Sequence, residues 1–455
     1  MKRTVQKSMI AVLTFCLSQL FFFSPGWAQN DPLIRMEIPS SPNPVGSGAR
    51  ALGMGGAFIA IADDATAASW NPGGLIQLDV DKPEISFVGD YIYRTEDNSF
   101  GSHPEASRSE SIDDYNLNYL SAAYPFEAGA RNMIVSLNYQ HLYDFNRDWN
   151  FNFNYSNPVY TAPVQVDYEQ EGNLYALGLA YCVEVHPDFS AGITLNYWGD
   201  FLYENKWEQN YLLKRSMIIP PPPAVGTLRN STENKKEEFS FEGWNANLGF
   251  LWKIGKNWRL GGVFKTPFTA DIDHKITTET VQTFPTNPAL NTHTVTTQSY
   301  DEELRMPMSY GIGLAYRFSD TFRVSADIYR THWDDFEFRD AQGNKTSPVS
   351  GKDIADSDID PTTWFRFGAE YRMEMTSSVI SLRGGAFYDP APAEGSPDDY
   401  YGFSFGSGLA YGRYVFDIAY QFRFGDDVGG SSLQGLDFSQ DVREHKVYMS
   451  LIVHL

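Results

Sequence analysis

Cysteine is scarce in this sequence, basic residues are outnumbered, and long apolar runs are absent after the first thirty residues. Two cysteines in 455 residues argue against a disulfide-stapled domain. The 35 Lys and Arg residues face 57 Asp and Glu residues, and the formal net charge of -22 argues against a nucleic-acid partner. The missing apolar runs argue against a helical membrane protein. Aromatic residues, 15% of the chain, and 37 glycines are abundant instead, as in a β-barrel whose strands face lipid.

The first 28 residues have the features of a secretory signal peptide. Three basic residues within the first seven positions precede an apolar run from Met9 to Phe23, and small residues follow just before position 29. The run is shorter than the roughly 20 residues of a membrane-spanning helix, so a permanent anchor is the weaker interpretation. Because Cys16 lies inside the signal, Cys182 is the only cysteine of the mature chain, and we expect it to serve packing.

Segments of about ten residues that alternate apolar with polar or small side chains begin near Glu84 and continue to the C-terminus, the period of two that is typical of β-strands. In residues 414–424 the aromatic and aliphatic side chains share one face, while Asp417, Gln421 and Arg423 share the other. The same alternation in other segments places four further residues on the polar face: Arg317, Trp364, Arg366 and Arg372. The alternation alone fits both a soluble β-sandwich and a membrane barrel.

About fourteen such strands follow one another, an even number as in bacterial outer-membrane barrels. We expect them at 84–93, 115–125, 131–143, 172–185, 189–202, 236–253, 257–269, 303–318, 321–336, 362–374, 378–388, 399–411, 413–424 and 442–455. Tight turns alternate with long polar links, which lie at 94–114, 144–171, 203–235, 270–302, 337–361, 389–398 and 425–441. Outer-membrane barrels sort their connections in this way, with short periplasmic turns and long extracellular loops. A soluble sandwich has no reason to do so.

An open sheet in lipid would leave the backbone groups of its edges unpaired, at several kcal/mol each, so the sheet must close. Residues 442–455 alternate up to the last residue, which suits a final strand that seals against the first. Candidates for the aromatic girdles are Tyr91, Tyr93, Tyr181, Tyr197 and Tyr411. The sequence predicts an all-β fold, a transmembrane antiparallel β-barrel over residues 84–455 of the bacterial outer membrane.

Residues 29–83 lack the strand pattern and are rich in small side chains, with a turn at Asn71-Pro72-Gly73. Glycine and alanine allow a close approach to a barrel wall, so we expect this segment to fold back into the lumen as a plug or hatch. A flexible periplasmic tail is the weaker alternative, because Phe58, Ile59, Ile61 and Trp70 would then lie in water.

The stretch from Ser47 to Leu75, which contains GARALGMGGAF, ADDATAA and the Asn-Pro turn, resembles the N-terminal region of the FadL (OmpP1/TodX) family of outer-membrane transporters for long-chain fatty acids and other hydrophobic compounds. Weaker similarities occur at 304–307, 333–336, 365–372 and 383–390. The resemblance implies a fourteen-stranded barrel, an N-terminal hatch, passive diffusion of a hydrophobic ligand and its lateral release through a kinked strand. It also implies a hatch motif at Gly53, Gly55, Gly56, Asn71, Pro72 and Gly73, where glycine replaces the alanine of the family's Asn-Pro-Ala.

A hydrophobic ligand needs an apolar pocket and few polar anchors, since each buried CH₂ gains roughly 0.8 kcal/mol. Phe58, Ile59 and Ile61 of the hatch and Trp364 are candidates for lining the pocket. An anionic head group could pair with an inward arginine, and the candidates are Arg317, Arg366, Arg372 and Arg423. Pairing of these arginines with lumen carboxylates such as Glu370 and Asp417 is the alternative.

We expect a hydrophobic small molecule, outer-membrane lipid and lipopolysaccharide as partners, a monomeric state, and neither a metal nor another cofactor. Two alternatives remain open: a structural or shuttle protein of the same fold that handles secreted proteins, and an outer-membrane lipase. The motif Gly402-Phe403-Ser404-Phe405-Gly406 matches the G-x-S-x-G pattern of hydrolases. It lies within a predicted strand rather than at a strand-to-helix turn, so we expect no enzyme.

Overall fold

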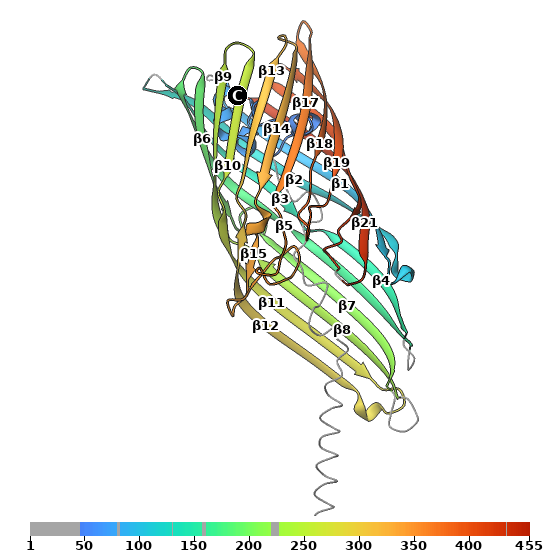
Figure 1. The fold of residues 1–455 in the computed structure, drawn as a ribbon. Helices are drawn as coiled ribbons and strands as arrows, with labels where there is room; N and C mark the ends of the chain where they lie inside the picture. The colour runs from blue at the N-terminus through green and yellow to red at the C-terminus, as the bar shows by residue number, and fades with distance from the viewer. Residues whose placement is uncertain (1–45, 80–81, 130, 157–160, 220–226, 434) are drawn as a thin grey trace, which may run out of the picture.

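Fourteen antiparallel strands form a closed ring in the computed structural model, which describes residues 46–79, 82–129, 131–156, 161–219, 227–433 and 435–455 (Figure 1). The strands of the ring are β1 (Glu84–Phe100), β2 (Arg108–Ala128), β3 (Arg131–Asp144), β5 (Thr161–His186), β6 (Phe189–Trp198), β9 (Gly243–Ile254), β10 (Trp258–Lys265), β13 (Ser309–Arg317), β14 (Phe322–Thr331), β17 (Thr362–Glu374), β18 (Ser378–Tyr388), β19 (Tyr401–Tyr411), β20 (Tyr414–Val428) and β21 (Phe438–His454). Each corresponds to one predicted strand, so the predicted fold class is confirmed. No described helix has the length and apolar composition to cross a bilayer. The predicted signal peptide, residues 1–28, lies outside the described residues.

The ring closes where β1 meets β21. Their ladder runs without a register shift from Glu84 opposite His454 to Phe100 opposite Phe438. The first and the last strand therefore leave no open edge to the membrane, where an unpaired backbone group would cost several kcal/mol. This pairing confirms the expected seal between the two ends of the barrel.

The apolar face of each strand points outward. In β20 the side chains of Phe416 and Ile418 are 47% and 42% exposed, whereas Asp417 between them is 1% exposed and faces the lumen. The girdle candidate Tyr411 is exposed as well. A soluble sandwich would bury the apolar face instead, so the orientation decides between the two folds that the alternation allowed.

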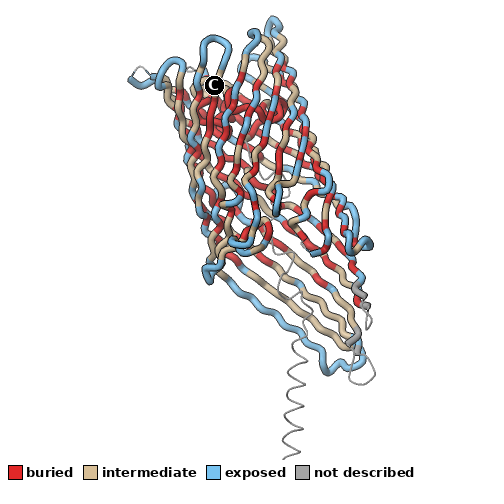
Figure 2. The backbone as a smooth tube through the Cα atoms, in the orientation of Figure 1, coloured by how far each residue is buried: buried red, intermediate tan, exposed pale blue. Residues whose placement is uncertain are grey.

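Most of the long links are not loops but further strands, and the prediction of loops there is wrong. They contain β4 (Arg147–Ser156), β7 (Lys206–Ile219), β8 (Thr227–Ser240), β11 (Phe268–Thr283), β12 (Thr292–Met306), β15 (Glu337–Arg339) and β16 (Lys345–Thr346). With the first half of β5, the strands β4, β7, β8, β11 and β12 form a sheet, here called the wing, that projects beyond the ring (Figures 1 and 2). The far end of β12 is exposed on both faces, so its sequence lacks the alternation that marks a half-buried strand.

Three predicted strands are divided at the rim where ring and wing meet. The chain leaves one sheet and enters the other between β8 and β9, between β10 and β11, and between β12 and β13. Pro267 and Pro307 stand at two of these corners, where proline interrupts a ladder because it has no N–H to donate. The wing has a core of its own near the rim, in which Trp207 stacks on Phe239 with ring centroids 4.7 Å apart.

Residues 46–79, here called the luminal segment, lie inside the ring. They contain two short helices, α2 (Ala49–Gly53) and α3 (Ala67–Trp70), and the 3-10 helix η1 (Pro72–Gln77). These elements contact strands on opposite sides of the barrel, α2 meeting β19 and β20 while η1 meets β6 and β9. The part of the predicted hatch that precedes residue 46 lies outside the described residues. Cys182 is buried beneath the carbonyl oxygen of Gly73, which agrees with the expected packing role.

Pairs of glycines on neighbouring strands make room for the backbone of this segment. The register places Gly192 opposite Gly249, Gly261 opposite Gly313, and Gly368 opposite Gly385. A Cβ atom on Gly385 would lie 2.3 Å from the backbone nitrogen of Gly55, and one on Gly261 would lie 2.5 Å from the carbonyl oxygen of Ile59. Both distances are too short for any side chain. The small residues that the sequence concentrates in the luminal segment therefore meet equally small residues in the wall.

Substitution of Gly385 by valine should displace the luminal segment, because the new side chain would clash with backbone atoms of Met54 and Gly55, which no substitution can make smaller. Gly384→Val is the matched control, since a Cβ at Gly384 approaches no atom closer than 3.9 Å. We expect cells that carry Gly385→Val to become sensitive to large hydrophilic antibiotics while the barrel still folds, as judged by its heat-modifiable migration in gels. Equal resistance of both variants to these antibiotics would contradict the conclusion that Gly385 makes room for the luminal segment.

Candidate functional site

A cluster of opposite charges ties the luminal segment to the wall at the end of the barrel that carries the short turns. Arg50 Nη1 lies 2.7 Å from Asp63 Oδ1 within the segment. Arg50 Nε also reaches Glu370 of β17, at 3.1 Å. Arg323 of β14 bridges the same two carboxylates, at 2.9 Å from Asp63 and 2.6 Å from Glu370. Arg383 of β18 approaches Glu370 to 2.7 Å.

The charges in this cluster outweigh the cost of burial. Burial alone would raise the pKa of Asp63, but the fields of Arg50, Arg323 and Arg259 hold that pKa well below its ordinary value. A carboxyl group with a depressed pKa in the native state stabilises that state above its unfolded pKa, near 3.9, and loses this effect only as the pH falls through the lower native value. The charge cluster, here called the clamp, therefore holds the luminal segment at any pH from neutral down to about 4.

Hydrogen bonds to backbone groups hold the rest of the luminal segment. Asp327 of β14 accepts from the backbone nitrogens of Phe58 and Ile59, at 2.7 and 2.9 Å. The side chain of Asn71 donates to the carbonyl oxygens of Ile59 and of Phe250 in β9, at 2.9 and 2.8 Å. Ser404 accepts from the backbone nitrogen of Gly55 at 2.8 Å. The serine of the hydrolase-like motif thus points inward, as its place in a strand predicts, and serves as an anchor.

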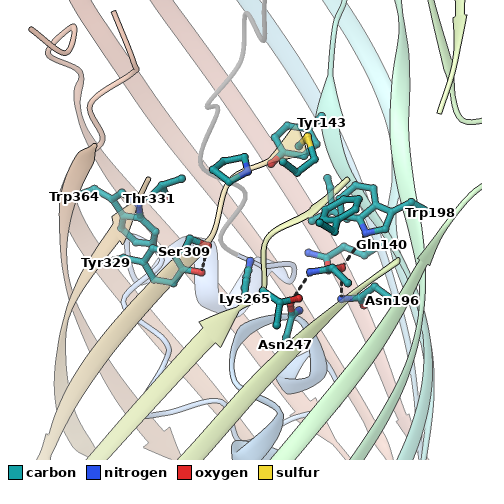
Figure 3. Close-up of a pocket in the computed structure, with 16 residues that line it drawn as sticks. Gln140, Tyr143, Asn196, Trp198, Asn247, Lys265, Ser309, Tyr329, Thr331 and Trp364 are labelled. Atoms are coloured by element: carbon teal, nitrogen blue, oxygen red, sulfur yellow. Dashed lines mark hydrogen bonds between the residues drawn. The ribbon is translucent and has the colours of Figure 1, made fainter. Parts of the chain in front are cut away.

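A pocket lies on the side of the luminal segment that faces the wing (Figure 3). Two aromatic pairs flank it: Tyr329 stacks on Trp364 with centroids 4.4 Å apart, and Trp198 stacks on Phe268 at 5.4 Å. The remaining lining residues are Gln140, Leu142, Tyr143, Asn196, Asn245, Asn247, Lys265, Thr266, Met306, Pro307, Ser309 and Thr331. Aromatic walls with a few polar groups are the usual composition of a site for a hydrophobic ligand.

Some polar groups of the pocket form hydrogen bonds with one another. Asn245 accepts from Trp198 Nε1 at 2.9 Å and donates to Asn247 at 3.3 Å. The indole Nε1 of Trp364 is buried and has no acceptor among the described residues. This N–H can donate to a ligand that carries an oxygen atom, so the pocket offers at least one directional contact beside its aromatic surfaces.

Next to this pocket the wall lacks part of its ladder. Pairing between β2 and β3 ends at Tyr119 opposite Gln140, although β2 continues to pair with β1 and β3 with β5. Residues 141–144 of β3 therefore have no partner on β2 in the described structure. We call this stretch, between 114–118 of β2 and 141–146 of β3 and its following turn, the unpaired wall. Gln140, Leu142 and Tyr143 line the pocket at this place.

The luminal segment meets the wall at the same level. Tyr119, the last residue of β2 that pairs with β3, donates from its hydroxyl to the carbonyl oxygen of Ala65 at 3.1 Å. A second pocket, lined by Ile61, Asp63, Arg317 and Arg372 among others, lies at the short-turn end. The luminal segment thus lies between two pockets, and the unpaired wall borders the aromatic one.

The structure places the predicted hatch residues in two groups. Phe58 and Ile61 are fully buried in the core of the luminal segment, where Phe58 meets Trp70 edge to face. Ile59 packs instead against Tyr329 and Trp364, the aromatic pair of the pocket. Trp364 is the one predicted binding residue that lines this pocket directly.

The predicted arginines do not gather at one place. Arg317 and Arg372 belong to the short-turn end, on the far side of the luminal segment from the aromatic pocket. Arg366 and Arg423 are buried and share Asp389, at 3.5 and 3.1 Å. Carboxylate pairing is therefore observed for both, with Asp389 rather than Glu370 or Asp417 as the partner. The two terminal nitrogens of Arg423 have no hydrogen-bond partner in the described part of the chain.

Sequence reasoning missed the pocket residues Trp198, Phe268, Tyr329 and Lys265. Two of them, Lys265 and Phe268, stand beside Pro267, which interrupts a strand pattern at a corner between ring and wing, as Pro307 does at another. Proline inside such a pattern signals a break in the ladder and could have marked these corners. Among the described residues no group of three or more His, Cys, Asp or Glu side chains is placed to hold a metal ion.

Ring, luminal segment and lipid-facing apolar surface together define a β-barrel of the bacterial outer membrane. The sequence model of the outer membrane protein transport protein family (OMPP1/FadL/TodX) matches residues 44–428, and the chain belongs to this family. This result confirms the resemblance that the N-terminal motifs indicate. No curated protein sequence matched the chain.

Solved structures of similar fold share little sequence with this chain. A FadL homologue of Pseudomonas aeruginosa is 15% identical, with a TM-score of 0.59 over 90% of this chain and 98% of the homologue. The toluene transporter TodX of Pseudomonas putida is 15% identical, with a TM-score of 0.53 over 90% of this chain and 98% of TodX. The monoaromatic hydrocarbon channel CymD is 16% identical, with a TM-score of 0.51 over 91% of this chain and 98% of CymD. At this level of identity the comparisons confirm the fold.

Asp63→Asn should loosen the luminal segment, because it leaves Arg50 and Arg323 with one carboxylate fewer at a cost of about 3 kcal/mol. We expect higher ion conductance of the purified barrel in planar bilayers, with Asp320→Asn, an exposed residue at the same end, as the control. The wild-type conductance should stay constant from pH 8 to about 4. An ion conductance of Asp63→Asn equal to that of the wild type would contradict the role of the charge cluster.

Proposed function

We propose that the protein is a passive channel for hydrophobic molecules in which the luminal segment acts as a hatch and the ligand leaves sideways through the unpaired wall. The observation that carries this proposal is the continuity between the aromatic pocket and the wall. Leu142 and Tyr143 line the pocket and belong to the part of β3 that has no partner on β2. A ligand in the pocket would therefore contact the wall where β2 and β3 share no backbone hydrogen bonds.

Lateral release follows from the energetics of the two routes. Movement along the barrel axis would require the hatch to break its charge cluster and its hydrogen bonds to Asp327, Asn71 and Ser404. Movement through the unpaired wall breaks no β2–β3 backbone hydrogen bond, and only side-chain contacts must rearrange. Leu142, which stands at a register shift in the ladder with β5, supplies the local irregularity of β3 that the family resemblance leads us to expect.

The ligand proposed for the pocket is hydrophobic, with aromatic compounds and long-chain fatty acids as the classes to test. Tyr329, Trp364, Trp198 and Phe268 would enclose an apolar or aromatic body, and Ile59 would form the floor on the hatch side. Phe58 and Ile61 would support that floor from within the hatch. For a polar end group, Trp364 Nε1 and Lys265 are the partners that line the pocket, whereas none of the four arginine candidates lines it.

The outer surface of the barrel would contact outer-membrane lipid and lipopolysaccharide, and a monomer suffices for the proposed route. The single chain closes its own ring and contributes both the pocket and the unpaired wall. The family is one of transport proteins, and the serine that suggested a hydrolase holds the hatch instead.

Removal of either stacked ring of the pocket should weaken ligand uptake. We expect Trp364→Ala and Tyr329→Ala each to lower the initial uptake of a radiolabelled hydrophobic ligand about tenfold at low ligand concentration, because an aromatic surface of the site is lost. Phe365→Ala changes the neighbouring, lipid-facing side chain and should leave uptake unchanged. Equal uptake by all three variants would place the ligand elsewhere.

A covalent bridge across the unpaired wall tests the lateral route. The side chains of Asp114 and Asn146 meet across the unpaired wall, where Asn146 donates to Asp114 at 2.8 Å, so cysteines at both positions lie within reach of a short, reducible thiol crosslinker. After treatment with the crosslinker the double variant Asp114→Cys/Asn146→Cys should lose uptake, and a reductant should restore it. The pair Ala122→Cys/Leu137→Cys, register partners inside the intact ladder, is the control that should stay active. Full uptake by the crosslinked double variant would exclude release between β2 and β3.

A further inference from the structure

We propose that the unpaired wall is a charge filter, which passes the uncharged form of a hydrophobic ligand and holds back carboxylates. The inference rests on the proposed lateral release and adds a selection of substrate by charge. It concerns three side chains around the unpaired wall, Asp90 of β1, Asp114 of β2 and Asp144 of β3, here called the acidic frame.

Hydrogen bonds place the acidic frame at the unpaired wall. Asp90 accepts from Asn118, which stands at the register shift of β2, at 2.9 Å. Asp114 and Asp144 both accept from Asn146, in the turn after β3, the former from its side chain at 2.8 Å and the latter from its backbone nitrogen at 2.7 Å. Asp90 and Asp144 are 6% and 3% exposed.

The charges of the frame are not cancelled by direct ion pairs. The hydrogen-bond donors named above are amides, and no described cation lies within ion-pair distance of the three carboxylates. The nearby cations have carboxylates of their own: Arg94 pairs with Glu96 at 2.9 Å, and Lys446 pairs with Glu444 at 3.1 Å. His141 lies in the same stretch, with its Nε2 at 3.0 Å from the carbonyl oxygen of Tyr143. One oxygen of Asp90 is buried without a donor in the described structure.

Such a frame acts on a passing ligand through its charge. Like charges at close range in a barrel wall of low dielectric repel strongly, so a carboxylate meets a barrier that an alcohol or a hydrocarbon of the same size does not. A hydroxyl group can instead donate to the unpaired oxygen of Asp90. In the pocket the only charged lining residue is Lys265, which attracts an anion. A carboxylate is therefore stabilised in the pocket and opposed at the exit, and both effects slow its departure.

The test compares a long-chain alcohol with the carboxylate of the same length at neutral pH. Both are given in radiolabelled form to cells that express the full-length protein and lack another channel of this family. We expect the wild type to take up the alcohol at least about tenfold faster than the carboxylate. The triple variant Asp90→Asn/Asp114→Asn/Asp144→Asn should bring the two rates within about threefold by raising carboxylate uptake, with little change for the alcohol.

Control variants separate the frame from the general acidity of the surface. Asp97 and Asp113 lie on the same two strands, β1 and β2, but are exposed, and Asp97→Asn/Asp113→Asn should keep the wild-type ratio. If the triple variant fails to fold, as judged by heat-modifiable migration, the single variants Asp90→Asn and Asp144→Asn should each shift the ratio part of the way.

Two results would overturn the inference. Equal uptake of alcohol and carboxylate by the wild type would show that the wall does not select by charge. An unchanged ratio in folded frame variants, with alcohol uptake intact, would show that the selection arises elsewhere. Both differ from failure of the proposed function itself, in which neither compound enters faster than in cells without the protein.

Discussion

The closed ladder of backbone hydrogen bonds is the constraint on which the rest of this molecule depends. Inside a bilayer no water can pair a free N–H or C=O group, so the chain must bring its last strand back to its first. Closure in turn creates a lumen, and the alternation of side chains fills it with polar groups while the apolar residues meet lipid. The luminal segment, the pocket and the acidic frame all occupy the space that this closure creates.

Within the closed ring, polar side chains take over wherever the backbone cannot pair. Asp327, Asn71 and Ser404 bind backbone groups of the luminal segment, which has too few residues in helices to satisfy itself. Asn118 and Asn146 stand at the place where β2 and β3 separate. The same kind of interaction therefore holds the luminal segment in place and frames the break in the wall, and these two places lie at adjacent levels of the barrel.

The ring could be predicted from the sequence because lipid on one side and a polar lumen on the other impose a strict alternation, as in 414–424. The wing could not, because strands such as β12 have solvent on both faces and their residues obey no such rule. Trp364 was identified from its place on the inward face, but Trp198 and Tyr329 join it only through the three-dimensional closure of the ring. Partners of the arginines, such as Asp389 for Arg423, depend on register and loop geometry that no periodicity encodes.

The paired glycines beneath the luminal segment restrict how this chain can vary. A methyl group on either Gly368 or Gly385 would enter the same space, which is already taken by backbone atoms of Met54 and Gly55. A compensating change elsewhere cannot create room, because a main chain has no atoms to give up. The wall has least freedom to vary at such pairs, so family members whose luminal segment lies in this position should keep both glycines together or lose both.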